Sequence, residues 1–169
     1  MVVETRPFDL DSLPHPDISV FINRQNMTAY PLITSLGCQF QCNFCVVSHV
    51  TNKQWRPRSV ERIVDECATR IGLYPNVRTV VISDDNPLSD RRRFRDFLAR
   101  YAALGRDQLL SVANVRADTL DTAMVARLKA ANCQAICLGV ESGDPFVFER
   151  VHRGADHAPF LPSIIGRVG

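Results

Sequence analysis

Three cysteines within eight residues are the part of this sequence best suited to chemistry. They are Cys38, Cys42 and Cys45, in the segment GCQFQCNFC. Thiolates are the usual protein ligands of iron–sulfur clusters, and three of them can converge on one cluster when the backbone loops around it. Three ligands leave one iron of a four-iron cubane open, much as an open position separates catalytic from structural zinc. The spacing therefore predicts a cluster that can also bind a small molecule.

Two other interpretations of the cysteines stay open. Free cysteines are often buried core residues, and that is the interpretation we give to Cys67, Cys133 and Cys137. Zinc is the second alternative, because a two-residue gap such as that between Cys42 and Cys45 fits a zinc knuckle. No second pair of Cys or His follows at zinc spacing, and His49 is the only nearby candidate for a fourth ligand.

Alternating strands and helices must position these cysteines. Short β-branched or apolar runs predict strands, and longer segments with apolar residues at helical spacing predict helices. The expected strands are 30–34, 77–82, 109–115 and 133–140, and the expected helices are 59–72, 89–105, 120–132 and a short one from 144 towards 154. We take Ser59 and Ser89 as N-caps of the first two helices. Four such alternations predict an α/β fold with a parallel sheet, whose ligands bind at the carboxyl ends of the strands.

Composition and charge point to an ordinary cellular protein. The 169 residues are 46% hydrophobic and 22% charged, which is typical of one globular domain. A net charge of +2 is too near balance to indicate nucleic acid or a membrane surface. No apolar run is long enough to span a bilayer, and the N-terminus has no secretory apolar region. We expect a cytoplasmic location, where cysteines are reduced thiols or metal ligands.

The cysteine motif resembles that of the radical S-adenosylmethionine (radical SAM) superfamily. CxxxCxxC after a glycine at the end of a first strand, with an aromatic residue before the last cysteine, carries this resemblance. Further segments match in order, and three of them are similar to the cobalamin-associated branch. The matching segments are 9–14, 56–66, 83–86 (SDDN) and 139–143 (GVESG). The resemblance covers roughly residues 9–154.

The resemblance implies a partial (β/α) barrel. The family barrel has six βα units, and this sequence supplies about four, which correspond to its N-terminal part. We expect an extended N-terminal linker at 1–28, a partial radical SAM core at 29–160 and a tail at 161–169. The chain looks truncated, so we expect a missing C-terminal half or an oligomer. No Asp-x-His-x-x-Gly motif is present, so any cobalamin domain would lie outside this chain.

The resemblance also implies cofactors, partners and a reaction. Cys38, Cys42 and Cys45 would hold a [4Fe-4S] cluster whose fourth iron is chelated by SAM, and a reduced cluster would cleave SAM to methionine and a 5′-deoxyadenosyl radical. The implied partners are SAM, an electron donor such as flavodoxin or ferredoxin, and a substrate of unknown identity. Two alternatives remain: an inactive fragment that still binds a cluster, and a zinc-binding interaction module.

Five further residues are implied as cofactor contacts. Glu141 would accept hydrogen bonds from the ribose or the methionine ammonium, with Ser142 beside it. Arg116 would grip the methionine carboxylate or pair with Asp118 or Glu141. Asp85 would bind ligand while its neighbour Asp84 caps a turn. Phe44 would face the adenine or shield the cluster.

Overall fold

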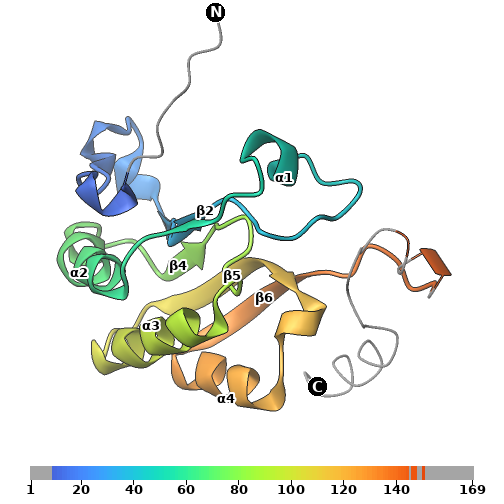
Figure 1. Ribbon diagram of the computed structural model, residues 1–169. Helices are drawn as coiled ribbons and strands as arrows, with labels where there is room; N and C mark the ends of the chain where they lie inside the picture. Colours follow the sequence, from blue (N-terminus) through green and yellow to red (C-terminus); the bar gives the residue numbers. More distant parts are fainter. Residues whose placement is uncertain (1–8, 145, 148–149, 151–169) are drawn as a thin grey trace, which may run out of the picture.

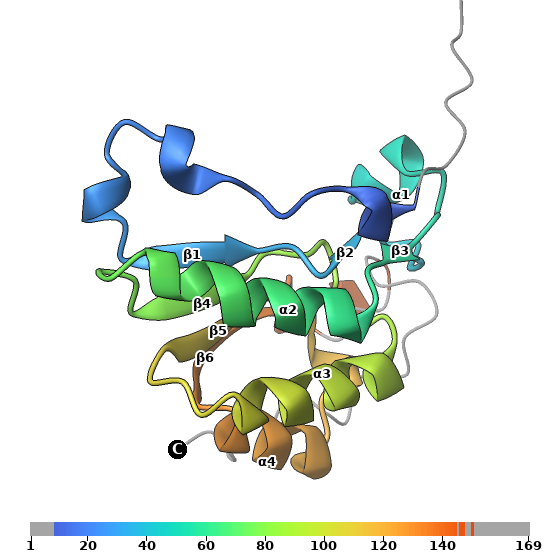
Figure 2. The same ribbon diagram turned by 90° about the vertical axis from the view of Figure 1, so that its left-hand side faces the viewer.

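A four-stranded parallel sheet forms the centre of the molecule. The computed structural model describes residues 9–144, 146–147 and 150. The strands are β1 (Ala29–Leu32), β4 (Thr79–Ile82), β5 (Leu109–Arg116) and β6 (Cys133–Gly139), and they lie in the order β1-β4-β5-β6 with every neighbouring pair parallel (Figure 1; β1 is labelled in Figure 2). Within this sheet, each strand lies next to the strand that comes before it in the chain. This arrangement confirms the predicted α/β fold with four parallel strands, as in a partial (β/α) barrel.

Three helices cover one face of this sheet. They are α2 (Val60–Arg70), α3 (Arg91–Ala103) and α4 (Thr122–Ala130), and they lie side by side in front of the strands in Figure 2. Burial alternates along β1 and β4, so every second side chain, such as Leu32 and Ile82, is in the core. Helix residues such as Phe94 and Met124 complete the same hydrophobic cluster. The core therefore lies between the sheet and the helices, and the other face of the sheet is more open.

Side-chain caps fix where the helices begin. The Ser59 hydroxyl accepts a hydrogen bond from the Arg62 amide at 3.2 Å, which confirms the predicted cap of α2. The predicted cap at Ser89 is wrong by one residue. Asp90 caps α3 by accepting from two backbone amides of its first turn, because a carboxylate also opposes the positive end of the helix dipole. Asp121 caps α4 by accepting from one backbone amide, that of Met124, at 2.7 Å.

The N-terminal segment differs from the extended linker that the sequence predicts. It contains three 3-10 turns: η1 (Leu10–Ser12), η2 (Ile18–Val20) and η3 (Arg24–Asn26). Leu10 and Ile18 are buried. The ring of His15 lies 2.7 Å from the Asp65 carboxylate, and it is also near the buried carboxylate of Glu66. These contacts attach the segment to α2. The domain boundaries themselves stay a prediction.

Several small elements were not foreseen from the sequence. Strands β2 (Ser35–Leu36) and β3 (Arg56–Pro57) pair antiparallel, and the single turn α1 (Val47–Val50) lies between them in the chain. Two 3-10 turns, η4 (Ile71–Leu73) and η5 (Ala117–Thr119), follow α2 and β5. Among the described residues, no helix is both long enough and apolar enough to cross a membrane. The predicted tail at 161–169 and the end of the predicted last helix lie outside the described residues.

Candidate cluster and cofactor site

The loop that carries the three cysteines begins with a forced backbone turn. This cluster loop, residues 37–45, leaves β2 and leads into α1, beyond the carboxyl end of β1 (Figure 2). Gly37 has φ +86°, a region that L-residues rarely adopt. A Cβ on Gly37 would also overlap the carbonyl oxygen of Gln54. A glycine is therefore required here.

The three thiols of the loop lie near one another and are partly buried. All three are thiols rather than halves of disulfides. Burial raises the pKa of the Cys42 thiol, the neighbouring thiols of Cys38 and Cys45 raise it further, and Arg116 opposes them. The described residues contain no group of three or more His, Cys, Asp or Glu side chains that could hold a metal ion. A cubane of four irons is wider than one ion, so thiols that share it stand further apart, and thiolates are its usual ligands.

Arg116 is a charged side chain that reaches a thiol of the cluster loop. It lies at the end of β5 and is 9% exposed. Its Nη1 donates to the sulfur of Cys42 at 3.2 Å, and its Nε and Nη2 donate to the two carboxylate oxygens of Asp118 at 3.0 Å each. The guanidinium carbon lies 4.1 Å from the centre of the Phe40 ring. Of the pairings weighed from the sequence, the structure shows the one with Asp118.

Three polar residues that follow β4 contact the cluster loop or the residues just before it. The buried carboxylate of Asp84 accepts from the Thr34 amide at 2.6 Å, the Thr34 hydroxyl at 2.5 Å and the Ser35 hydroxyl at 2.6 Å. Burial raises the pKa of Asp84, although these hydrogen bonds act in the opposite direction. The predicted turn-capping role of Asp84 is thus replaced by a tie between β4 and the β1–β2 corner.

Asp85 and Asn86, which follow Asp84, contact the cluster loop directly. Asp85 Oδ2 accepts from the Gly37 amide at 2.7 Å, and Asn86 Nδ2 lies 3.9 Å from the sulfur of Cys38. Asp85 therefore positions the first residue of the loop. Its predicted contact with a cofactor stays a prediction.

Glu141 and Ser142 lie just after β6, at the same end of the sheet as Arg116. Arg116 and Gly139 are partners in the β5–β6 register. Glu141 is exposed, with φ +60°, and a Cβ placed on Gly139 would lie 3.3 Å from its Oε1. The Glu141 carboxylate thus folds back over the strand end. Ser142 Oγ accepts from the Asp144 amide at 3.1 Å.

The remaining aromatic and cysteine predictions have mixed outcomes. Phe44 is 54% exposed, so in this structure it leaves much of its ring to solvent. Cys67 is fully buried, and burial raises its pKa to about 12, which confirms it as a neutral core thiol. Cys133 is half-buried on β6. Cys137 is exposed on the same strand, so the core interpretation is wrong for this residue, because its side chain points to the open face of the sheet.

Sequence reasoning missed some residues that shape the site. Asn114, and Asn86, which was noted only as part of the matching segment 83–86, are the main ones. Asn114 adopts φ +55° at an irregularity in β5, and its amide donates to the Asp84 carbonyl at 2.9 Å. Asparagine tolerates this conformation better than most residues, so a lone Asn within an apolar strand pattern was a usable signal. Asp118, two residues after Arg116, was seen only as one of two possible partners.

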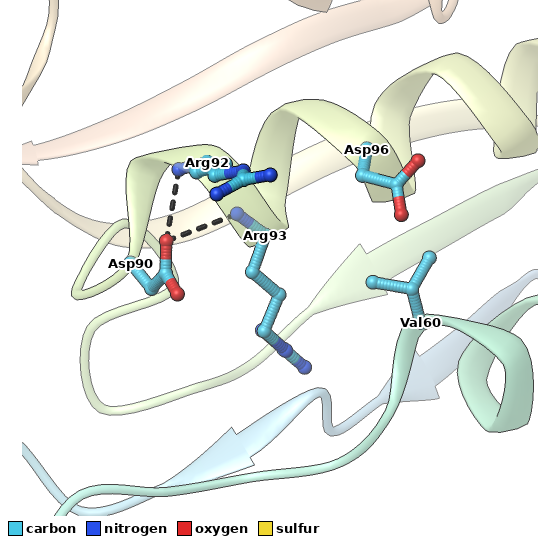
Figure 3. A pocket seen from close by; sticks show the side chains of 5 residues that line it. All are labelled: Val60, Asp90, Arg92, Arg93 and Asp96. Carbon is cyan, nitrogen blue, oxygen red and sulfur yellow. Dashed lines mark hydrogen bonds between the residues drawn. The ribbon is translucent and has the colours of Figure 1, made fainter.

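A separate open hollow lies between the first turns of α2 and α3. It measures about 540 Å³ and is lined by Val60, Asp90, Arg92, Arg93 and Asp96 (Figure 3). The lining mixes both signs of charge, and Asp90 already accepts from the amides of Arg92 and Arg93. None of the lining residues belongs to the cluster loop. The chemistry-bearing residues therefore lie elsewhere, at the carboxyl ends of the strands.

Known sequences similar to this chain share its cysteine-bearing region. The model of the radical SAM superfamily matches residues 32–164. An uncharacterized methyltransferase of Pyrococcus horikoshii is 27% identical over 86% of this chain and 32% of its own length. Bacteriochlorophyllide d C-12(1)-methyltransferase of Chlorobaculum tepidum is 25% identical over 94% of this chain and 36% of its own length. The chain spans about a third of the length of these relatives.

Solved structures show the same fold. The methyltransferase TsrM from Kitasatospora setae, a radical S-adenosylmethionine enzyme solved with cobalamin and a [4Fe-4S] cluster, superposes with a TM-score of 0.66. Its complex with tryptophan and a SAM analogue gives 0.67. Sequence identity is 16% in both, and the match covers 74% and 76% of this chain but 25% of the other. This likeness concerns the fold alone.

Proposed function

Because this chain belongs to the radical SAM superfamily, we propose that Cys38, Cys42 and Cys45 hold a [4Fe-4S] cluster and that SAM binds at the carboxyl end of the sheet. The observation that carries the proposal is the cluster loop itself. It brings together three thiols, and Asp85 fixes its first residue by a 2.7 Å hydrogen bond. When bound, such a cluster supplies one low-potential electron for reductive cleavage of the SAM sulfonium.

The residues around the loop divide the work of binding. Glu141 is exposed at the end of β6, where its carboxylate can accept hydrogen bonds from ribose hydroxyls or an ammonium group. Ser142 and Phe44 supply polar and aromatic contacts to the nucleoside. Arg116 has two of its nitrogens on Asp118 and the third on Cys42. A two-pronged grip on the methionine carboxylate needs two of those nitrogens, so we place Arg116 on the cluster side of the site.

Methyl transfer is the reaction class that we propose for the whole protein. The relatives from Pyrococcus horikoshii and Chlorobaculum tepidum are both described as methyltransferases. The solved neighbour TsrM binds cobalamin, so cobalamin on a domain outside this chain is part of the proposal. We further propose an electron donor of the flavodoxin or ferredoxin class and a reducing, cytoplasmic setting. The six cysteines, which are thiols rather than disulfides in the structure, support that setting.

Metal analysis after anaerobic reconstitution tests the cluster. We expect about four irons and four sulfides per chain, the cubane count, and loss of both in Cys38→Ala, Cys42→Ala and Cys45→Ala. Cys67→Ala is the matched control, because Cys67 is a buried core thiol on α2. Equal loss of iron from the Cys67 variant, or one zinc and no sulfide in the unmodified chain, would contradict the proposal.

SAM binding is measured on the same preparation by calorimetry. Glu141→Gln keeps the shape of the side chain but removes its charge, so we expect affinity to fall about tenfold while iron content stays the same. Asp107→Asn, at an exposed loop position before β5, serves as the charge-matched control. Release of 5′-deoxyadenosine then separates an active enzyme from a fragment that only holds the cluster.

A further inference from the structure

The guanidinium of Arg116 is held on three sides. Asp118 accepts from Nε and Nη2 at 3.0 Å each, and the Phe40 ring lies against the guanidinium at 4.1 Å. The Thr119 hydroxyl donates to the Arg116 carbonyl at 2.6 Å, which also fixes the backbone after β5. The remaining nitrogen, Nη1, donates to the sulfur of Cys42 at 3.2 Å. The aim of this nitrogen at a cluster ligand is therefore set by the structure around it.

The three cysteine ligands have different surroundings. Cys42 receives a charged N–H donor at 3.2 Å, whereas Cys38 has a neutral amide, from Asn86, at 3.9 Å. Hydrogen bonds to the sulfurs, net charge and solvent exposure set the reduction potential of iron–sulfur clusters. Arg116 is 9% exposed, and water screens a charge in such a place only weakly.

We propose that Arg116, oriented by Asp118 and Phe40, raises the reduction potential of the cluster through the sulfur of Cys42. The proposal rests on the function proposed above. Reduction adds one electron, and with it one negative charge, to the cluster and its thiolates. A cationic N–H donor at a ligand sulfur stabilises that charge. Asp118 acts in two ways, since it aims the guanidinium and partly offsets its charge. Arg116 is thus a positioning residue that acts on the cofactor through Cys42.

A redox titration of the reconstituted 169-residue chain, without SAM, tests this role. Dithionite supplies the electron, no bond forms or breaks, and electron paramagnetic resonance reports the reduced fraction at each poised potential. In Arg116→Met, which keeps the apolar stem, we expect the ratio of reduced to oxidised cluster at the wild-type midpoint to fall about tenfold, equivalent to about 59 mV for one electron. Arg116→Lys keeps the charge without the fork, and we expect a smaller shift in the same direction.

A variant of Asp118, the partner of Arg116, should shift the midpoint potential in the opposite direction. Asp118→Asn keeps an oxygen acceptor for the guanidinium but removes the offsetting charge, so we expect a shift to higher potential. Damage to the loop would not shift the potential in opposite directions in the two variants. Arg92→Met is the matched control, because Arg92 is exposed on α3 and lines the separate hollow. Its midpoint should equal that of the wild type.

The outcomes of this titration separate the redox role of Arg116 from other roles. A wild-type midpoint in Arg116→Met with full iron content overturns the proposal, even if SAM affinity falls, since that pattern would mark Arg116 as a SAM contact only. If Arg116→Met loses its cluster, Arg116→Lys and Asp118→Asn decide, and wild-type midpoints in both overturn it. A wild-type chain that takes up no iron overturns the proposed function as well, so the two failures are distinguishable.

Discussion

At the scale of single residues, Gly37 is the position where the backbone leaves least choice. Its φ of +86° and the carbonyl of Gln54 beside it leave no room for a side chain. We expect Gly37→Ala to lower the free energy of unfolding by more than about 1 kcal/mol and to reduce iron uptake, because the loop must shift. Gly72→Ala is the control, since its nearest atom, Nη1 of Arg106, would be 3.9 Å away. Urea unfolding and iron analysis measure both effects, and equal behaviour of the two variants would contradict the argument.

What the sequence reveals about single residues depends on how local the signal is. Cys38, Cys42 and Cys45 are close in the chain, so their spacing alone predicts a shared ligand. Arg116 contacts Cys42 from 74 positions away, and no periodicity encodes a contact of that range. Its partner Asp118 is only two residues away, yet pairing with Glu141 was equally compatible with the sequence. The structure decides because η5 turns Asp118 back toward Arg116.

At the scale of elements, apolar periodicity was enough to place the strands and helices, but not their ends. Ser89 and Asp90 are adjacent and both are good N-caps, so the sequence could not choose between them. In the structure Asp90 is the cap, and the backbone carbonyl of Ser89 accepts a hydrogen bond from Gln39 of the cluster loop at 3.0 Å. The β2–β3 pair was missed because two-residue strands carry no periodic pattern. These short elements are the ones that shape the cluster loop.

Asp84 links β4 to the β1–β2 corner, and its ionisation has a predictable effect on stability. Burial raises its folded-state pKa above the ordinary value of 3.8. A folded state that holds the proton more tightly is stabilised at low pH, and this contribution is lost as pH rises through the folded-state pKa. We therefore expect the free energy of unfolding of Asp84→Asn, relative to wild type, to increase as pH rises from 3.8 through the folded-state pKa of Asp84. Urea unfolding of the apo chain at several pH values measures it.

Asp121 provides a control of opposite sign for that experiment. Its pKa is lowered, mainly by the hydrogen bond from the Met124 amide and also by Arg91. Its contribution to stability is therefore present above the unfolded-state pKa and is lost as pH falls through the folded-state value. The Asp121→Asn variant should lose stability relative to wild type as pH rises from acid to neutral. The same slope in both variants would mean that Asp84 is not the group responsible.

At the scale of the whole molecule, the alternation of strands and helices was sufficient to predict the parallel sheet. Parallel strands need a crossover, and each of the three helices predicted between the strands supplies one. The uneven burial of the sheet did not follow from the pattern. Its helix-covered face is closed, while Cys137 and other side chains on the opposite face are exposed in the described part of the chain. Sequence periodicity shows that a strand is apolar, but it does not show how many layers cover it.

The outer edge of β6 leads to a prediction about association. Among the described residues, β6 has a strand neighbour on one side only, and unpaired edges favour pairing with another chain. Ile136 and Leu138 are half-buried against the core. The surface of β6 that another chain can contact is therefore its backbone edge together with Cys137. We expect the 169-residue chain to self-associate, with a molar mass that rises with concentration in size-exclusion chromatography with light scattering.

Three variants identify the surface responsible. Cys137→Lys places a charge on the edge strand and should shift the chain toward monomer, while Cys137→Ser controls for disulfide formation and should still associate. The competing surface is the turn after η2, where Ile22 is 91% exposed next to Phe21. Exposed apolar groups of this kind can also drive association, so Ile22→Ser is the matched test. Association that persists in Cys137→Lys and disappears in Ile22→Ser would move the interface from the sheet edge to the N-terminal segment. Loss of association in Cys137→Lys alone would establish that the chain associates through the outer edge of β6.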